Sequence, residues 1–151
     1  MNDIVATEIL LVEDNPQDLE LALRALQKAK LSNRIQIARD GAEALEFIFC
    51  EGPHAGRRIE QGPQVIILDL KLPKIDGLQV LQRIKGDART TMIPVVVLTS
   101  SKEQKDVVES YRLGVNSYIV KPVNFESFVE SVQQLGMYWL LLNQPPEGPA
   151  R

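Results

Sequence analysis

The stretch that decides the fold runs Gln64-Val-Ile-Ile-Leu-Asp-Leu-Lys-Leu-Pro-Lys-Ile-Asp-Gly77. Its first part, 65–68, is a short apolar run rich in β-branched residues, which is typical of a strand buried on both faces. Asp69 follows this run directly, at the place where open parallel sheets bind their ligands. A proline and the pair Asp76-Gly77 then turn the chain into a helical pattern. Alternatively Asp69 only ends a strand, and the rest of the chain must decide between these interpretations.

The composition is that of an ordinary globular domain. The chain has 151 residues, of which 44% are apolar and 25% charged, and these values favour one domain with a substantial core. A net charge of -3 gives no electrostatic footprint for nucleic acid. A single cysteine, Cys50, excludes an internal disulfide and suits a reducing compartment. The sequence shows neither a signal-peptide pattern nor an apolar run long enough to span a bilayer, so we expect a cytoplasmic protein that uses no membrane.

Short strand patterns alternate with helical patterns along the chain; most are apolar runs, and 34–38 alternates apolar and polar residues. The expected strands are 8–12, 34–38, 65–68, 94–98 and 117–120, and the expected helices are 17–30, 40–48, 77–86, 101–113 and 125–142. Ser101 is expected to cap the fourth helix, with Gln104 completing a capping box. The alternation predicts an α/β fold, a doubly wound five-stranded parallel sheet with helices on both faces. We expect one domain over 1–142 and a tail over 143–151, with no output domain.

Polar side chains follow four of the expected strands: Glu13 and Asp14, then Asp69, then Thr99, then Lys121. Because the carboxyl ends of parallel strands meet at one edge, we expect these residues in one crevice. Three crowded carboxylates repel one another unless a cation joins them, and hard oxygen ligands select Mg²⁺ or a similar ion. A carboxylate is also a competent phosphoryl acceptor. Lys121 can neutralise the acquired oxygens, and Thr99 can donate a hydrogen bond to one of them.

This pattern resembles the receiver domain of two-component response regulators. The match consists of Glu13-Asp14, Asp69, Thr99-Ser100 and Lys121-Pro122, and it covers about residues 8–142. The resemblance implies the flavodoxin-like receiver fold with strand order 2-1-3-4-5. It also implies that Asp69 accepts a phosphoryl group from the phosphohistidine of a histidine kinase and becomes 4-aspartylphosphate.

The resemblance further implies a metal site. Asp14 and Asp69 would ligate Mg²⁺, for which Mn²⁺ could substitute. Glu13 would help through a water molecule, and the backbone carbonyl of Lys71 would add a fourth contact. These assignments follow from the family and not from the spacing of the residues.

A conformational switch is implied in the same way. Lys121 would bond the phosphoryl group, and Thr99 would move toward it. Tyr118 matches the aromatic position that swings inward when Thr99 moves, and Pro122 resembles a cis-proline that aims the lysine inward. The signal would pass to the face formed by the fourth helix, the fifth strand and the fifth helix.

Two features exceed a minimal receiver. The connection 51–63 is longer than most such loops. The last helix carries surplus apolar residues, which suggests an interface: Met137, Tyr138, Leu140 and Leu141. Both features look like the single-domain response regulators of bacterial and cyanobacterial phytochromes, which tend to form dimers. We therefore expect a phytochrome histidine kinase as partner and a homodimer. The alternative partner is another histidine kinase.

The leading interpretation is a signalling switch rather than a turnover enzyme. A phosphatase or phosphotransferase of the haloacid dehalogenase type would resemble Asp-x-Asp, but Lys71 stands two positions after Asp69. A nucleotide or flavin binder is disfavoured because the chain lacks the glycine-rich phosphate motifs. A degenerate receiver that only mediates contacts remains the alternative, although the intact acidic set argues against it.

Overall fold

The computed structural model describes residues 9–28, 34–121 and 124–142, exclusive of the side chains at 61, 132 and 135–142. Five parallel strands form one sheet in the order β2-β1-β3-β4-β5, so the predicted topology is confirmed. The strands are β1 (Ile9–Val12), β2 (Ile35–Ala38), β3 (Val65–Leu68), β4 (Val95–Thr99) and β5 (Ser117–Val120). Val12 pairs with Leu68 across β1 and β3. The residues that follow these two strands, Glu13 and Asp69, therefore leave the sheet at the same level.

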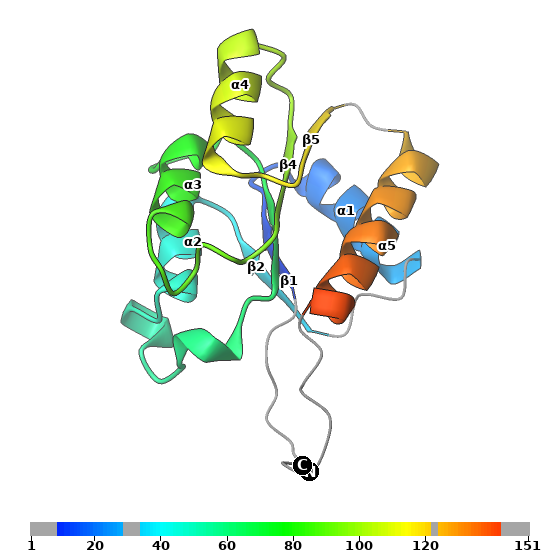
Figure 1. Ribbon diagram of the computed structural model, residues 1–151. Helices are drawn as coiled ribbons and strands as arrows, with labels where there is room; N and C mark the ends of the chain where they lie inside the picture. Colours follow the sequence, from blue (N-terminus) through cyan, green and yellow to red (C-terminus); the bar gives the residue numbers. More distant parts are fainter. Residues whose placement is uncertain (1–8, 29–33, 122–123, 143–151) are drawn as a thin grey trace.

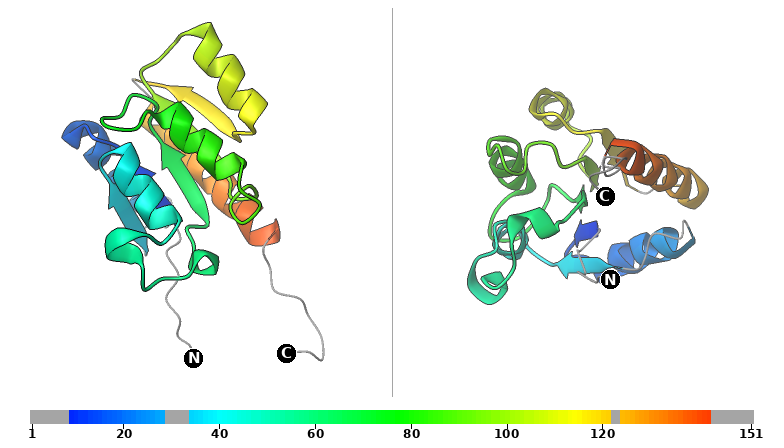
Figure 2. Two further views of the ribbon diagram at one scale, coloured as in Figure 1. Left: turned by 90° about the vertical axis from the view of Figure 1, so that its left-hand side faces the viewer. Right: turned by 60° about the horizontal axis from the view of Figure 1, so that its bottom comes forward.

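Helices cover both faces of the sheet (Figure 1). They are α1 (Pro16–Lys28), α2 (Gly41–Ile48), α3 (Gly77–Lys85), α4 (Gln104–Leu113) and α5 (Phe125–Leu142). Figure 2 shows from two further directions that α1 and α5 lie on one face, whereas α2, α3 and α4 lie on the other. No helix in the described part of the chain is long and apolar enough to cross a bilayer.

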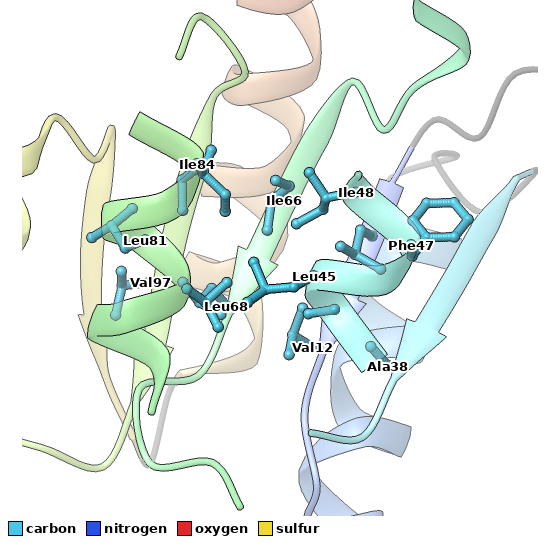
Figure 3. Packing of buried hydrophobic residues seen from close by; sticks show 14 of the residues in the cluster. Val12, Ala38, Leu45, Phe47, Ile48, Ile66, Leu68, Leu81, Ile84 and Val97 are labelled. Atoms are coloured by element: carbon cyan, nitrogen blue, oxygen red, sulfur yellow. The ribbon is translucent and has the colours of Figure 1, made fainter. Parts of the chain in front are cut away.

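The core consists of two apolar layers separated by the sheet. Since successive strand residues point to opposite faces, Leu10 and Ile66 belong to the layer under α2 and α3, whereas Leu11 and Ile67 belong to the layer under α1 and α5. Figure 3 shows the first of these layers. Because helices cover both faces of the sheet, β1, β3 and the first four residues of β4 are continuous apolar runs, which is typical of parallel sheets.

The predicted cap of the fourth helix is wrong. Helix α4 begins at Gln104 with Glu103 at the N-cap position, so Ser101 lies outside the helix. The Ser101 hydroxyl donates instead to the buried carboxylate of Asp106, because a buried carboxylate needs a hydrogen-bond donor more than a solvated helix end does. The other end agrees with the expectation, since Gly114 closes the helix at a φ of 104°.

The long connection 51–63 contains two short 3-10 helices, η1 (Gly52–His54) and η2 (Ile59–Gln61). Arg57 holds this segment against α2. Its guanidinium group donates hydrogen bonds to the carbonyl oxygens of Phe47 (2.5 Å) and Gly62 (2.8 Å). It also stacks 3.8 Å from the centre of the Phe47 ring. Arg57 therefore ties both ends of the segment to the domain, while Ile59 packs against the core and the His54 ring contacts the Phe47 ring.

Candidate functional site

Three carboxylates meet at the carboxyl edge of the sheet. Glu13 and Asp69 are buried, whereas Asp14 is exposed to solvent. One carboxylate oxygen from each residue lies within 4.8 Å of the others. The parallel strands β1 and β3 produce this convergence because both end at the same level of the sheet. A set of hard oxygen ligands with one open side suits a single Mg²⁺ or Mn²⁺ ion.

Lys121 follows β5 and reaches into the same cluster. Its ammonium nitrogen lies 2.8 Å from Glu13 Oε1, 3.1 Å from Asp69 Oδ2 and 2.9 Å from Asp18 Oδ2. The backbone N–H of Lys121 donates to the carbonyl oxygen of Thr99 at 2.8 Å, so the end of the sheet fixes the start of this side chain. The ammonium group of Lys121 thus offsets part of the negative charge of Glu13, Asp69 and Asp18.

Burial and charge shift the pKa values of two of these groups. Burial raises the pKa of Glu13 to about 7, and the charge of Asp69 acts in the same direction against the hydrogen bond from Lys121. Burial alone would lower the pKa of Lys121, but hydrogen bonds to Asp18 and Glu13 and the charge of Asp69 raise it above its ordinary value. Lys121 therefore stays protonated, and Glu13 can take up a proton near neutral pH.

The turn after β3 positions Asp69. The backbone N–H of Lys71 donates to Asp69 Oδ1 at 3.1 Å, while Lys121 binds the other oxygen. Gly77 closes this turn with a hydrogen bond from its N–H to the carbonyl oxygen of Leu70 (2.9 Å). A Cβ atom at position 77 would lie 2.4 Å from the carbonyl oxygen of Asp69 and from the Cα of Leu70. Only glycine allows this close approach of the two backbone segments.

Thr99 ends β4 at the same edge of the sheet and is fully buried. Its hydroxyl oxygen accepts a hydrogen bond from the backbone N–H of Ser101 at 3.3 Å. The hydroxyl group of Tyr118, on β5, donates to the carbonyl oxygen of Ser101 at 3.0 Å. Thr99 and Tyr118 are therefore linked through Ser101.

The structure brings four of the predicted site residues into direct proximity: Glu13, Asp14, Asp69 and Lys121. The metal-binding role of the Lys71 carbonyl stays a prediction. The expected cis-proline at position 122 lies outside the described residues, and so do the side chains of the expected interface residues Met137, Tyr138, Leu140 and Leu141.

Asp18 is the site residue that the sequence analysis missed. It lies in the first turn of α1, and its carboxylate binds Lys121. The available signal was its place in the first turn of a helix that begins directly after the acidic pair, since that turn faces the same edge of the sheet. An acidic residue there is also common for a different reason, the favourable interaction with the helix dipole, so the signal is weak by itself.

Comparison with known proteins agrees with this geometry. Residues 9–133 match the family model described as the response regulator receiver domain. The chain belongs to the receiver domain family. Receiver domains accept phosphate from histidine kinases and bind a divalent metal, and the acidic cluster described above has the composition that this requires.

Three relatives illustrate the range of the family. The probable methanogenesis regulatory protein FilR2 of Methanothrix harundinacea is 43% identical over 94% of this chain and 88% of its own length. The bacteriophytochrome response regulator RtBRR is 53% identical, with a TM-score of 0.77 over 95% of this chain and 86% of that one. The Mn²⁺-bound response regulator Rcp1, known from Synechocystis, is 38% identical, with a TM-score of 0.76 over 93% of this chain and 99% of that one.

Proposed function

We propose that this receiver accepts a phosphoryl group on Asp69 from a histidine kinase, in a reaction that depends on Mg²⁺. The observation that carries the proposal is the convergence of the three carboxylates with the ammonium group of Lys121. The carboxylates provide ligands for a cation, and Lys121 provides a donor for the phosphoryl oxygens. On this proposal the protein is a signalling switch and not a turnover enzyme.

The metal ion would be held by Asp14 and Asp69, with Glu13 acting through a water molecule and the Lys71 carbonyl as a backbone ligand. Bound there, Mg²⁺ would offset the negative charge that develops on the phosphoryl oxygens. Rcp1 supports this assignment, because that relative binds Mn²⁺. The exposed position of Asp14 leaves one side of the cluster open to a phosphodonor.

In the transfer step, a carboxylate oxygen of Asp69 attacks the phosphorus atom of a phosphohistidine. A P–O bond forms and the P–N bond breaks, and the imidazole nitrogen leaves with the electron pair and takes up a proton from solvent. Lys121 then donates a hydrogen bond to a phosphoryl oxygen, and Thr99 donates a second one. The raised pKa of Lys121 keeps its ammonium group charged for this task.

The response to phosphorylation would be a change in the face formed by α4, β5 and α5. Thr99 and Tyr118 would move together because Ser101 links them. Val108 and Tyr111 of α4 are exposed on the outside of the domain, which supports this helix as part of a homodimer interface. Light scattering at micromolar protein concentration tests the dimer, and a monomer both with and without phosphorylation would count against it.

The partner kinase is proposed to be a phytochrome, because RtBRR is a bacteriophytochrome response regulator. The alternative partner is a histidine kinase that is not a phytochrome. The similarity to FilR2 supports this alternative, because FilR2 is described as a probable methanogenesis regulatory protein. Phosphotransfer from a purified phytochrome kinase and from an unrelated histidine kinase distinguishes the two. A faster transfer from the unrelated kinase would contradict the phytochrome assignment.

The second candidate function is a contact module that is never phosphorylated. The test is the intact mass of the protein after incubation with Mg²⁺ and a small acyl phosphate. We expect a phosphate adduct on the wild type that is lost without Mg²⁺ and absent from Asp69→Asn. Asp76→Asn is the matched control, because Asp76 is an exposed acidic residue in the same turn. No adduct on the wild type would favour the contact module.

A further inference from the structure

Helix α4 differs from the other helices in what it buries. Its two buried residues, Asp106 and Ser110, are both polar, whereas α1 buries leucine and alanine and α3 buries valine, leucine and isoleucine besides a glycine. A helix that packs on a sheet usually buries an apolar stripe. Burying a carboxylate costs free energy unless it is hydrogen-bonded. Asp106 is only 6% exposed, so its position depends on a specific partner.

That partner is Ser101. The Ser101 hydroxyl donates to Asp106 Oδ2 at 2.5 Å, and both groups are buried. A hydroxyl that donates to a carboxylate forms a short hydrogen bond that is stronger than a neutral one. The bond ties α4 to the segment that follows β4.

The main chain of Ser101 reaches the functional site and β5. Its N–H donates a hydrogen bond to the hydroxyl oxygen of Thr99, and its carbonyl oxygen accepts a hydrogen bond from the hydroxyl group of Tyr118. Three different groups of one residue thus join Thr99, α4 and β5. A displacement of Thr99 that carries Ser101 with it must lengthen at least one of the other two bonds.

The surroundings of α4 leave room for a second arrangement. A pocket of about 450 Å³ separates the start of α4 from the turn after β3. The hydroxyl group of Ser110 is buried and has no hydrogen-bond partner. Ser110 is four positions after Asp106 and therefore on the same face of the helix. Asp106 thus has a second donor available on its own helix when Ser101 withdraws.

We propose that Asp106 is a positioning residue that couples the Asp69 site to α4 through Ser101. This proposal rests on the phosphorylation of Asp69 proposed above. In the arrangement described here, Asp106 accepts a hydrogen bond from the Ser101 hydroxyl group, and the N–H of Ser101 donates to the hydroxyl oxygen of Thr99. When Thr99 moves toward phosphorylated Asp69, Ser101 follows, its bond to Asp106 breaks, and α4 is released.

The test is amide hydrogen exchange of α4 before and after incubation with Mg²⁺ and a small acyl phosphate, with the adduct measured by intact mass. In the wild type, phosphorylation should speed exchange in α4. In Asp106→Ala, exchange in α4 should already be roughly tenfold faster before phosphorylation, as expected for the loss of a hydrogen bond to a charged group. It should then change no further, although the adduct still forms on Asp69.

Three variants sharpen this test. Asp106→Asn keeps an acceptor for Ser101 and should restore most of the wild-type response. Ser101→Ala removes only the donor and should reproduce Asp106→Ala, so it carries the test if Asp106→Ala does not fold. Glu109→Ala removes another carboxylate of α4. Glu109 binds Arg112 and not Ser101, so this variant should behave as the wild type.

Failure of the coupling and failure of the proposed function give different results. If Asp106→Ala or Ser101→Ala forms the adduct and α4 responds as in the wild type, the coupling is refuted and the phosphorylation stands. If the wild type forms no adduct, the proposed function is refuted, and the coupling is refuted with it.

Discussion

The ammonium nitrogen of Lys121 lies 2.9 Å from a carboxylate oxygen of Asp18, although the two residues are 103 positions apart. Asp18 thereby competes with Glu13 and Asp69 for the ammonium group of Lys121. If Lys121 must turn to a phosphoryl group on Asp69, it can leave Asp18 at the lowest cost. The Asp18 side chain is 36% exposed, so water can solvate its carboxylate once the ion pair is broken.

We therefore predict that Asp18→Asn is phosphorylated faster by a small acyl phosphate. The change releases Lys121 from one partner and lowers the negative charge that an anionic donor meets. Since the pair is partly exposed, the effect should be modest, roughly two- to fivefold in rate. Glu20→Gln is the matched control, because it removes the same charge from the same helix, where Glu20 binds Arg24 on the surface. Equal rates for both variants would show that only the general charge matters.

A second prediction concerns pH. Burial raises the pKa of Glu13 from its ordinary value of 4.5 to about 7. In the metal-free protein, the stability that comes from burying Glu13 in its protonated form is therefore fully present below pH 4.5. It is lost as the pH rises through about 7. Metal binding needs the carboxylate and should follow the opposite trend. Added Mg²⁺ should thus raise Tm more at about pH 8 than at about pH 6.

Thermal unfolding with and without Mg²⁺ at the two pH values measures this difference. Glu13→Gln, which cannot titrate, should respond to Mg²⁺ equally at both. A wild-type response to Mg²⁺ that is independent of pH would show that Glu13 is already ionised throughout the range and would contradict the raised pKa.

Gly77→Ala should damage both the fold and the site. The new Cβ atom would lie 2.4 Å from backbone atoms of Asp69 and Leu70, so the turn must open. We expect a loss of about 1–3 kcal/mol in the free energy of unfolding, measured with denaturant, together with slower phosphorylation. Gly56→Ala is the control, because a Cβ atom there meets nothing within 4 Å. Normal stability of Gly77→Ala would mean that the turn is less closely packed than described.

Arg57→Lys should loosen the connection 51–63 although it keeps the charge. Lysine cannot donate from one planar group to the carbonyl oxygens of both Phe47 and Gly62 while stacking on a ring. We expect a loss of about 1–2 kcal/mol in stability and faster amide exchange confined to this connection. Arg24→Lys changes an exposed arginine on α1 and should do neither. Unchanged exchange in Arg57→Lys would show that the segment is held by other contacts.

Much of the fold could be predicted because the signals are local. The strands β1 and β3 are short apolar runs, β2 alternates apolar and polar residues, and each strand is followed by a helical pattern. The order of elements is therefore visible in the chain itself. Gly77 and Gly114 mark a helix start and a helix end for steric reasons that depend on few neighbours. The predicted start of α4 is wrong because Ser101 and Gln104 match the sequence pattern of a capping box, whereas the Ser101 hydroxyl donates a hydrogen bond to the buried carboxylate of Asp106, five positions later.

The sequence by itself determined which chemical groups stand at the strand ends: the acids Glu13, Asp14 and Asp69, and the base Lys121. Once the sheet is parallel, these groups must share one edge. Only the tertiary structure decided which atoms pair. The sharing of Lys121 with Asp18 and the bond between Ser101 and Asp106 depend on how α1 and α4 pack on the sheet. Such contacts follow from the burial of whole helices, which no local pattern of residues encodes.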